Sequence, residues 1–231
     1  MKVALVTAAS RGMGAAIARR LADDGYRLAL MSRGEELSAV ANELGALACT
    51  GSVADSEDLN RFVETTVEEY GRIDVVVNNT GHAAKGDLLD LSDDEWHDGL
   101  NLLLLNVVRI ARLTTPLMEA AGGGAFVNIS TLGAAEPSPT YPVSSTLRAG
   151  LGAFTKLFAA RYAAAGVRMN NVLPGFIDSQ SFPAENIASI PMGRLGRVDE
   201  IAEAVAWLAS PASSYVTGQS LLVDGGLLKS I

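Results

Sequence analysis

The sequence predicts a single-domain α/β protein in which helices cover both faces of a doubly wound parallel sheet. Apolar, strand-like segments alternate with segments of helical periodicity along the whole chain, and only short loops separate them. No linker, repeat, low-complexity tract or change in composition divides residues 1–231. This alternation is typical of parallel strands joined by right-handed crossovers.

The first 21 residues predict a strand, a tight turn and a helix. An apolar run begins at Val3, small residues follow it, and helical periodicity extends from Met13 to Leu21. Gly12 and Gly14 lack a Cβ, so the turn can approach a ligand and the helix can pack closely on the strand. The free N–H groups at the start of such a helix favour a phosphate. The same pattern would also suit a tight turn that binds nothing.

The remaining elements follow the same alternation. Residues 74–79 form a near-continuous apolar run, as expected for a strand covered on both faces. Asp93 and Asp94 favour a helix start after Ser92, because the helix dipole stabilises acids in the first turn. Further strands are predicted at 26–31, 46–49, 125–129, 169–173 and 220–223. Helices are predicted at 35–44, 58–70, from 92 onward, within 143–165 and at 198–208.

Composition limits the class of protein. A chain of 231 residues with 48% hydrophobic content can bury a sizeable core. A net charge of −8 without any Lys/Arg run argues against a nucleic-acid partner. The single cysteine, Cys49, excludes an internal disulfide and a cysteine-based metal cluster, which suits a reducing cytoplasm, and we expect no metal site. The longest purely aliphatic run, 102–105, is far shorter than a membrane span, so no membrane partner is expected.

Four ordered motifs give the chain a resemblance to the short-chain dehydrogenase/reductase family over essentially its whole length. Ala8 stands at the first glycine of the family's Thr-Gly-x-x-x-Gly-x-Gly, and Ser52-Val53 replaces its Asp-Val near the adenine. The resemblance implies a Rossmann-type fold with a nicotinamide cofactor across the C-terminal ends of the strands. The motifs are Thr7-Ala8-Ala9-Ser10-Arg11-Gly12-Met13-Gly14, Asn78-Asn79-Thr80-Gly81, Asn170 with Pro174-Gly175-Phe176-Ile177-Asp178-Ser179, and Val223-Asp224-Gly225-Gly226.

The resemblance also implies which residues line the cofactor, and charge indicates which cofactor it is. A ribose 2′-hydroxyl is bound by a carboxylate at the end of the second strand, whereas a 2′-phosphate needs a cation there. That strand ends at Arg33 and Arg11 lies in the turn, so we expect NADP(H) in preference to NAD(H), although either arginine alone could be a surface charge. From adenosine to nicotinamide, the lining residues would be Ser10, Arg11, Met13, Arg33, Ser52, Asn79, Gly81, Pro174, Gly175, Ile177 and Ser179.

The family's proton-handling residues are replaced in this chain. The family uses a serine, a tyrosine and a lysine four residues after it, with a supporting asparagine. Counting along the matching segments places Thr131, Ser144 and Arg148 at the first three positions and Leu103 at the fourth. A serine hydroxyl is a much weaker acid than a phenol, and an arginine stays protonated. Arg148 could still bind the cofactor ribose, and Ser144 could bind a substrate oxygen.

Two other residues are alternative proton donors. Tyr141 lies three residues before Ser144, although Pro142 favours a helix start just there. His82 follows the Asn-Asn-Thr-Gly motif, and an ordinary imidazole pKa near 6.5 suits acid–base catalysis. Tyr141 could equally be a wall of the substrate pocket, and His82 a polar loop residue.

Two functions therefore stay open. The first is an NADP(H)-dependent oxidoreductase that acts on a small carbonyl or alcohol with an altered proton donor. The second is an NADP(H)-binding protein that has lost the chemistry and serves as a sensor or scaffold. The segment between Ser179 and Pro191 is shorter than the family's usual substrate loop, which implies a small lid.

The helix after residue 92 predicts self-association. A helix that is apolar nearly all round must be covered on both sides, although burial against the sheet could account for part of this pattern. The family commonly assembles through this helix, so we expect a homodimer or homotetramer. The apolar residues are Leu100, Leu102, Leu103, Leu104, Leu105, Val107, Val108, Ile110 and Leu113.

Overall fold

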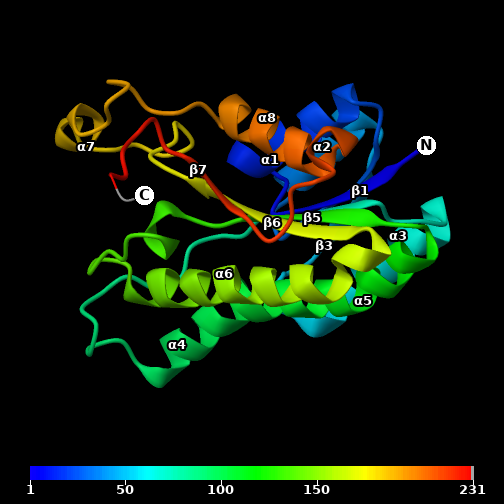
Figure 1. The fold of residues 1–231 in the computed structure, drawn as a ribbon, viewed down its shortest axis with the longest axis horizontal. Coiled ribbons are helices and arrows are strands. Elements are labelled where there is room, and N and C mark those ends of the chain that lie inside the picture. Colours follow the sequence, from blue (N-terminus) through cyan, green and yellow to red (C-terminus); the bar gives the residue numbers. More distant parts are fainter. Residues whose placement is uncertain (230–231) are drawn as a thin grey trace.

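The computed structural model, which describes residues 1–229, has a seven-stranded parallel sheet between two layers of helices (Figure 1). The strand order is β3-β2-β1-β4-β5-β6-β7, which confirms the predicted doubly wound fold. Strand β1 pairs with β2 on one side and with β4 on the other. The crevice between the C-terminal ends of β1 and β4 is therefore the topological switch point, where open α/β sheets bind ligands.

The elements lie close to the predicted ranges, with two additions. The helix α7 and a π-helical segment, η1, had no counterpart in the predicted order. The strands are β1 (Val3–Thr7), β2 (Arg27–Ser32), β3 (Leu47–Thr50), β4 (Val75–Asn78), β5 (Gly124–Ile129), β6 (Val167–Pro174) and β7 (Ser220–Val223). The helices are α1 (Gly12–Asp23), α2 (Glu36–Leu44), α3 (Ser56–Tyr70), α4 (Asp93–Leu100), η1 (Asn101–Leu105), α5 (Asn106–Ala120), α6 (Pro142–Tyr162), α7 (Ala184–Ala188) and α8 (Val198–Ala209), with short 3₁₀ turns η2 (Leu132–Ala134), η3 (Ala163–Ala165) and η4 (Pro211–Ser213).

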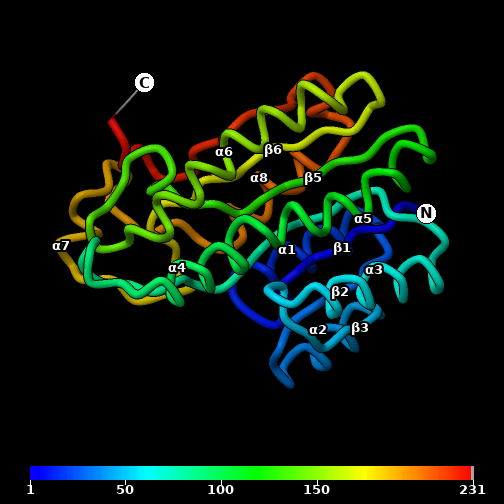
Figure 2. Tube along the Cα trace, turned by 90° about the horizontal axis from the view of Figure 1, so that it is seen from below, coloured from blue at the N-terminus to red at the C-terminus, as the bar shows by residue number. Residues whose placement is uncertain are grey.

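Each face of the sheet has its own hydrophobic core. Helices α1, α2 and α8 cover one face, and α3, α5 and α6 cover the other (Figure 1). Alternate residues of β1 serve the two layers: Val6 packs with the first and Leu5 with the second. In Figure 2, α4, α7 and the last described residues gather at one end of the molecule, away from the N-terminus.

A row of polar side chains, three of them buried asparagines, links four neighbouring strands. The Asn78 amide donates to Asn128 Oδ1 at 2.8 Å, and the Asn128 amide donates to Asn171 Oδ1 at 2.9 Å. The Asn171 amide donates in turn to Ser220 Oγ at 3.1 Å, and the Thr155 hydroxyl of α6 donates to Asn171 Oδ1 at 3.0 Å. These hydrogen bonds support the register of β4, β5, β6 and β7, the strands that carry one side of the site.

Ala8 is strained, and this leads to a stability prediction. Its φ of +48° is the only positive value at a non-glycine residue among residues 1–229. The left-handed conformation costs a residue with a Cβ about 1–2 kcal/mol, and glycine loses part of this advantage through its freer unfolded chain. We expect Ala8→Gly to raise the free energy of unfolding by about 0.5–1 kcal/mol. Urea unfolding should show a higher midpoint with an unchanged slope.

The matched control is the next residue, Ala9, which is fully buried and has no positive φ. Ala9→Gly removes a buried methyl group and adds chain freedom, so it should lower the midpoint. A lower midpoint for Ala8→Gly as well would show that surrounding contacts compensate for the strain at residue 8.

Candidate functional site

The glycine-rich turn and the end of β4 form one unit at the switch point. The Thr7 hydroxyl donates to the Asn79 carbonyl at 2.7 Å and accepts from the Asn79 N–H at 2.9 Å. The Asn79 amide donates to the Ala8 carbonyl at 3.2 Å. A Cβ on Gly14 would lie 2.1 Å from the Ala8 oxygen and 2.8 Å from Asn79 Nδ2. Residue 14 must therefore be glycine for α1 to pack here, and this packing fixes Asn79 beside the turn.

The adenosine side of the predicted cofactor site carries two exposed arginines. Arg11 precedes α1 and Arg33 follows β2, and neither forms an ion pair with a residue of the described chain 1–229. The Ser32 hydroxyl donates to Ser10 Oγ at 3.0 Å, which ties the turn to the end of β2. Two unpaired guanidinium groups beside a helix start fit the phosphate groups of NADP(H).

Two further predicted adenosine-side residues are held in place by local contacts. The Ser52 N–H donates to Asp58 Oδ2 at 2.8 Å, and Ser52 Oγ accepts from the Ala54 N–H at 3.3 Å. Met13 is partly buried against the core layer of α1, α2 and α8. Gly81 lies beside open space, because a Cβ there would have no neighbour within 4 Å.

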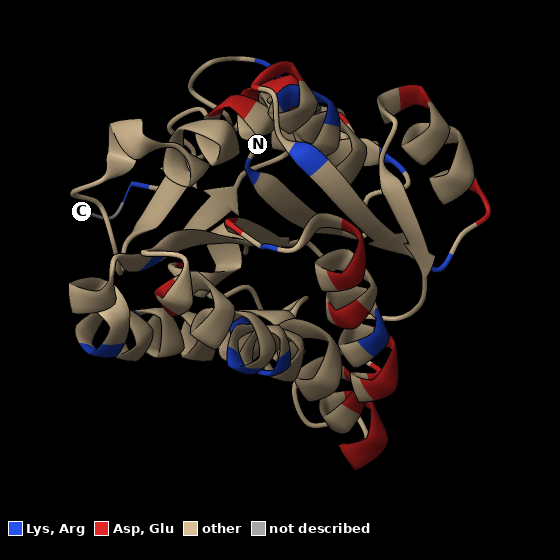
Figure 3. Cartoon of the chain, turned by 90° about the vertical axis from the view of Figure 1, so that its right-hand side faces the viewer, with Lys and Arg blue, Asp and Glu red and all other residues tan. Residues whose placement is uncertain are grey.

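The charge distribution makes these local arginines important. In the view of Figure 3, Lys and Arg appear as short separate segments among acidic ones, without a broad basic face. A net charge of −8 also repels anions at long range. Attraction for an anionic ligand therefore has to come from individual side chains at the site.

The predicted nicotinamide-side residues have partly structural roles. A Cβ on Gly175 would lie 2.8 Å from the Asp224 Cα, so packing against the chain after β7 already requires glycine there. Pro174 is buried at the end of β6, and the Ile177 side chain is 4% exposed within the core. A Cβ on Gly12 would lie 3.4 Å from Ser179 Cβ. The loop after β6 thus lies against the glycine-rich turn, and any contact from Ile177 to a ligand would come from its main chain.

Arg148 is buried at the centre of the site. Its side chain extends from α6 and is 8% exposed. Nη1 donates to the Ile129 carbonyl at the end of β5, and Nη2 donates to Thr80 Oγ1 at 3.1 Å. Burial lowers the pKa of Arg148 to about 10, so the group is still a cation at neutral pH. Ser144 lies one helical turn earlier and is half-buried.

The other two positions of the predicted set do not restore the family's pattern. Thr131 is the residue that caps the start of η2, and its Oγ1 accepts from the Gly133 N–H at 3.4 Å. Leu103 is fully buried within the π-helical segment. The neighbouring asparagines bond within their own helix: Asn101 Oδ1 accepts from Arg109, and Asn106 Oδ1 accepts from the Val107 N–H.

The two alternative proton donors differ in their surroundings. Tyr141 precedes the first residue of α6, is 40% exposed, and has Lys85 Nζ 5.0 Å from its ring centroid. His82 Nε2 lies 2.8 Å from Gln180 Nε2. Desolvation lowers the pKa of His82, and the cations Lys85 and Arg148 lower it further. The imidazole is therefore neutral at pH 7, which makes His82 a poor proton donor in a reduction.

Sequence reasoning missed three partners in this region. Thr80 binds Arg148, Lys85 lies over Tyr141, and Gln180 contacts His82. The signal for Thr80 was its hydroxyl at a position where the family's motif has alanine. Lys85 and Gln180 lie in loops without a motif, so the sequence offered no comparable signal for them.

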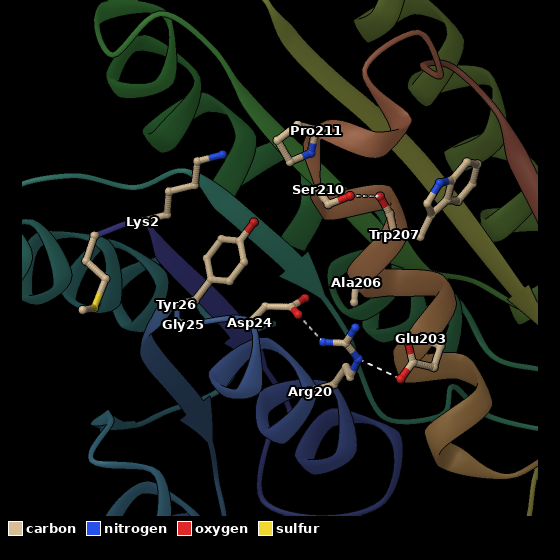
Figure 4. Close-up of a pocket in the computed structure, with 11 residues that line it drawn as sticks. Lys2, Arg20, Asp24, Gly25, Tyr26, Glu203, Ala206, Trp207, Ser210 and Pro211 are labelled. Carbon is tan, nitrogen blue, oxygen red and sulfur yellow. Dashed lines mark hydrogen bonds and ion pairs between the residues drawn. The ribbon is translucent and has the colours of Figure 1, made fainter.

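A cavity of about 590 Å³ lies at the opposite edge of the sheet, where β1 and β2 begin (Figure 4). The Arg20 guanidinium lies within it between two carboxylates, 2.5 Å from Asp24 Oδ1 and 2.7 Å from Glu203 Oε1. Tyr26 and Trp207 form part of the wall. Arg20 is therefore paired, whereas Lys2, which also lines the cavity, takes part in none of the ion pairs among residues 1–229.

A cavity of about 330 Å³ lies beside the ends of β6 and β7, next to the predicted nicotinamide segment. Phe176, Ile177, Met192 and Leu222 contribute its apolar walls. Arg194 forms two hydrogen bonds with the Glu200 carboxylate, at 2.8 and 2.9 Å, and these lower the pKa of Glu200 to about 2. This cavity is on the side of the sheet where a substrate would have to enter.

The continuous helix Asp93–Ala120 is long and apolar enough to cross a membrane, judged by length and composition alone. In the fold it packs against α3 and α6 and contributes Leu103, Val107 and Ile110 to the core. The core helices of globular proteins pass the same test, so this is weak evidence for a membrane span.

Comparison with known proteins agrees with this arrangement. The family described as Enoyl-(Acyl carrier protein) reductase matches residues 7–228. The 3-oxoacyl-[acyl-carrier-protein] reductase FabG of Staphylococcus aureus is 35% identical over 240 residues, covering 98% of each chain. The protein of the same name from Vibrio harveyi is 34% identical over 236 residues, covering 98% of this chain and 97% of the other.

Two solved structures have the same fold over the whole chain. YwfH, an NADPH-dependent reductase involved in bacilysin biosynthesis, has a TM-score of 0.94 at 25% identity and is covered over 99% of its length. The L-sorbose reductase of Gluconobacter frateurii, solved with NADPH and L-sorbose, has a TM-score of 0.93 at 28% identity, with 97% of its chain covered. By its motifs, its fold and these relatives, the chain belongs to the short-chain dehydrogenase/reductase family of oxidoreductases.

Proposed function

We propose that this chain is an NADP(H)-dependent oxidoreductase that acts on a small carbonyl or alcohol through a non-standard proton-donor set. The observation that carries the proposal is the pair of unpaired arginines, Arg11 and Arg33, on either side of the Ser10–Ser32 hydrogen bond. NADPH-dependent reductases among the structural relatives support this cofactor.

Different residues along the C-terminal edge of the sheet would bind the phosphates, the ribose and the substrate. Arg11 and Arg33 would bind the phosphate groups, and Asn79, fixed by Thr7, would line the ribose. The bound cofactor would supply or accept the hydride. Arg148 would hold positive charge beside the reacting oxygen, because it is buried between Thr80 and the end of β5. Of the two candidate proton donors we favour Tyr141, because the lowered pKa of His82 leaves its imidazole neutral at pH 7.

A non-catalytic NADP(H)-binding role is the second candidate. The observation in its favour is the Ser144 and Arg148 pair, which lacks the phenol and the primary ammonium of the family's pattern. A carbonyl-reduction panel with NADPH and NADH, run beside direct titration of both cofactors, separates the two roles. Turnover of any panel carbonyl supports the oxidoreductase, whereas tight NADPH binding without turnover supports the sensor or scaffold.

We also propose that the chain acts in the cytoplasm as a homodimer or homotetramer. Leu105 is the last residue of η1, and Val108 lies one helical turn later in α5. Both are apolar side chains that are partly exposed. Light scattering should give a multiple of the 24.1 kDa chain mass, and Leu105→Glu with Val108→Glu should shift it towards the monomer. Burying these leucine and valine side chains would be favourable, and burying unpaired carboxylates would not.

Leu89 provides the matched control for this test, because it is 89% exposed in the loop before α4. Leu89→Glu combined with Leu88→Glu, at the neighbouring exposed leucine, adds the same two charges outside the helix and should leave the mass unchanged. A native chain that scatters as a 24.1 kDa monomer at micromolar concentration contradicts the proposal.

A further inference from the structure

Arg148 is a buried cation without a counter-ion among residues 1–229. None of the ion pairs among residues 1–229 includes it, and desolvation alone accounts for its lowered pKa. Its two hydrogen-bond acceptors, the Ile129 carbonyl and the Thr80 hydroxyl, are both neutral. A guanidinium has five N–H donors, so two acceptors leave most of its bonding capacity unused. Buried charges are ordinarily paired, because their burial is costly otherwise.

Another arginine in the same chain shows how this fold satisfies a structural guanidinium. Arg168 also has no carboxylate partner in the described part of the chain, yet it donates to four oxygens, those of Leu208, Ser210, Ser213 and Val216. These oxygens surround its two terminal nitrogens at 2.9–3.3 Å. Arg148 has no such set of acceptors. The contrast indicates that Arg148 is built to meet a group from outside the chain.

The neighbourhood of Arg148 contains a second unpaired polar group. Ser130 directly follows Ile129, whose carbonyl binds Arg148, and it is 7% exposed. Its hydroxyl has no hydrogen-bond partner within residues 1–229. A guanidinium and a hydroxyl together offer donors, and the complementary ligand is an acceptor with negative charge. A carboxylate matches the planar, two-pronged donor pattern of arginine.

The cofactor's own anionic groups belong elsewhere on the sheet edge. Arg33 follows β2 and Arg11 follows β1, whereas Arg148 binds at the ends of β4 and β5. β2 and β5 are three strands apart, which is roughly 14 Å at ~4.8 Å per strand. The ribose would present only neutral hydroxyls to Arg148. The 2′-phosphate is therefore too far away to pair with Arg148, and we look for its anion in the substrate.

We propose that Arg148, with Ser130, binds a carboxylate of the substrate, so that the chain acts on oxo acids and the corresponding hydroxy acids in preference to neutral ketones. This rests on the proposed oxidoreductase function. In the reduction, a hydride from NADPH adds to the carbonyl carbon, and a proton from the proposed donor Tyr141, which solvent then reprotonates, reaches its oxygen. NADPH becomes NADP⁺, the oxo acid becomes a hydroxy acid, and the carboxylate is unchanged.

Binding of matched acids and esters tests the proposal without relying on turnover. The ligands are 2-oxobutyrate, acetoacetate and levulinate, each beside its methyl ester, titrated by calorimetry into the chain saturated with NADP⁺. At least one acid should bind ~10-fold or more tightly than its ester, as charge-assisted hydrogen bonds predict. Arg148→Gln should remove that difference, and Arg148→Lys, which keeps the charge but loses the two-pronged geometry, should retain part of it.

Arg109→Gln is the matched control. Arg109 is partly buried on α5 and binds Ala54 and Asn101, so the variant changes the net charge equally while leaving the site intact. It should keep the preference for the acid. Equal affinity of the native chain for every acid and its ester would overturn the proposal, as would an Arg148→Gln variant that keeps the preference.

The carboxylate site and the oxidoreductase function can fail separately. If Arg148→Gln does not fold, the comparison of acids with esters on the native chain still decides. Reduction of neutral ketones without any acid preference would leave the oxidoreductase function standing and overturn the carboxylate site. Selective acid binding without turnover of any carbonyl would support the carboxylate site and contradict the oxidoreductase function.

Discussion

Ser144→Tyr combined with Arg148→Lys is expected to raise the reduction of neutral ketones by NADPH by roughly 10²–10⁴-fold, the usual contribution of general acid–base catalysis. The two residues lie one turn apart on one face of α6, which is the spacing of the family's tyrosine and lysine. A lysine ammonium near a phenol favours the phenolate, so the phenol becomes a better acid. Native turnover of generic ketones should be very low by comparison.

The single variants are the controls for this result. Ser144→Tyr alone lacks the ammonium, and Arg148→Lys alone has no phenol to activate, so each should change turnover little. Steady-state kinetics with a neutral ketone measure the three variants on one scale. Brisk native turnover of neutral ketones would contradict the expected low activity, and its loss in Tyr141→Phe or His82→Ala would identify which of these residues is the donor.

Local patterns were sufficient to predict the fold. Continuous apolar strands such as residues 74–79 alternate with amphipathic helices, which predicts a parallel α/β sheet, and the family resemblance favoured its doubly wound form. The glycine-rich turn was equally predictable, because Gly12 and Gly14 have a specific position between strand and helix. The five-residue helix α7 is too short to show a helical period, and the leucine run at 102–105 is compatible with either α- or π-helical turns.

The burial, hydrogen bonds and pKa values of the site residues depend on contacts between distant parts of the chain, which the sequence does not show. Arg148 could be aligned with the family's lysine, but its burial and its bond to Thr80, 68 residues away, follow only from the packing of α6 against β6, which lets the side chain reach the ends of β4 and β5. The sequence interpretation gave His82 an ordinary pKa. In the fold, desolvation and the cations Lys85 and Arg148 lower that pKa, which removes the main reason for choosing His82. Spacing alone cannot show whether a charge is compensated.

Cofactor choice depends on a different kind of contact, the proposed one between the exposed Arg33 side chain and the 2′-phosphate of NADPH. Arg33→Ala should weaken NADPH binding by ~10-fold or more, because one charge-assisted bond to a phosphate contributes about 1.5–3 kcal/mol. NADH lacks the 2′-phosphate, so its affinity should hardly change. Fluorescence titration of both cofactors against the native chain and the variant gives the four dissociation constants. The native chain should bind NADPH more tightly than NADH.

Arg112→Ala separates a specific contact from a general change in charge. Arg112 is exposed on α5, on the opposite face of the sheet from α1, and has no ion-pair partner within residues 1–229. Its removal makes the net charge more negative by the same amount and should leave both affinities nearly unchanged at physiological ionic strength, where distant surface charges are screened. Added salt should reduce the preference for NADPH, since the Arg33 side chain is exposed. Equal losses for NADPH and NADH in Arg33→Ala would mean that Arg33 does not bind the 2′-phosphate, and that the selectivity resides in Arg11 or is absent.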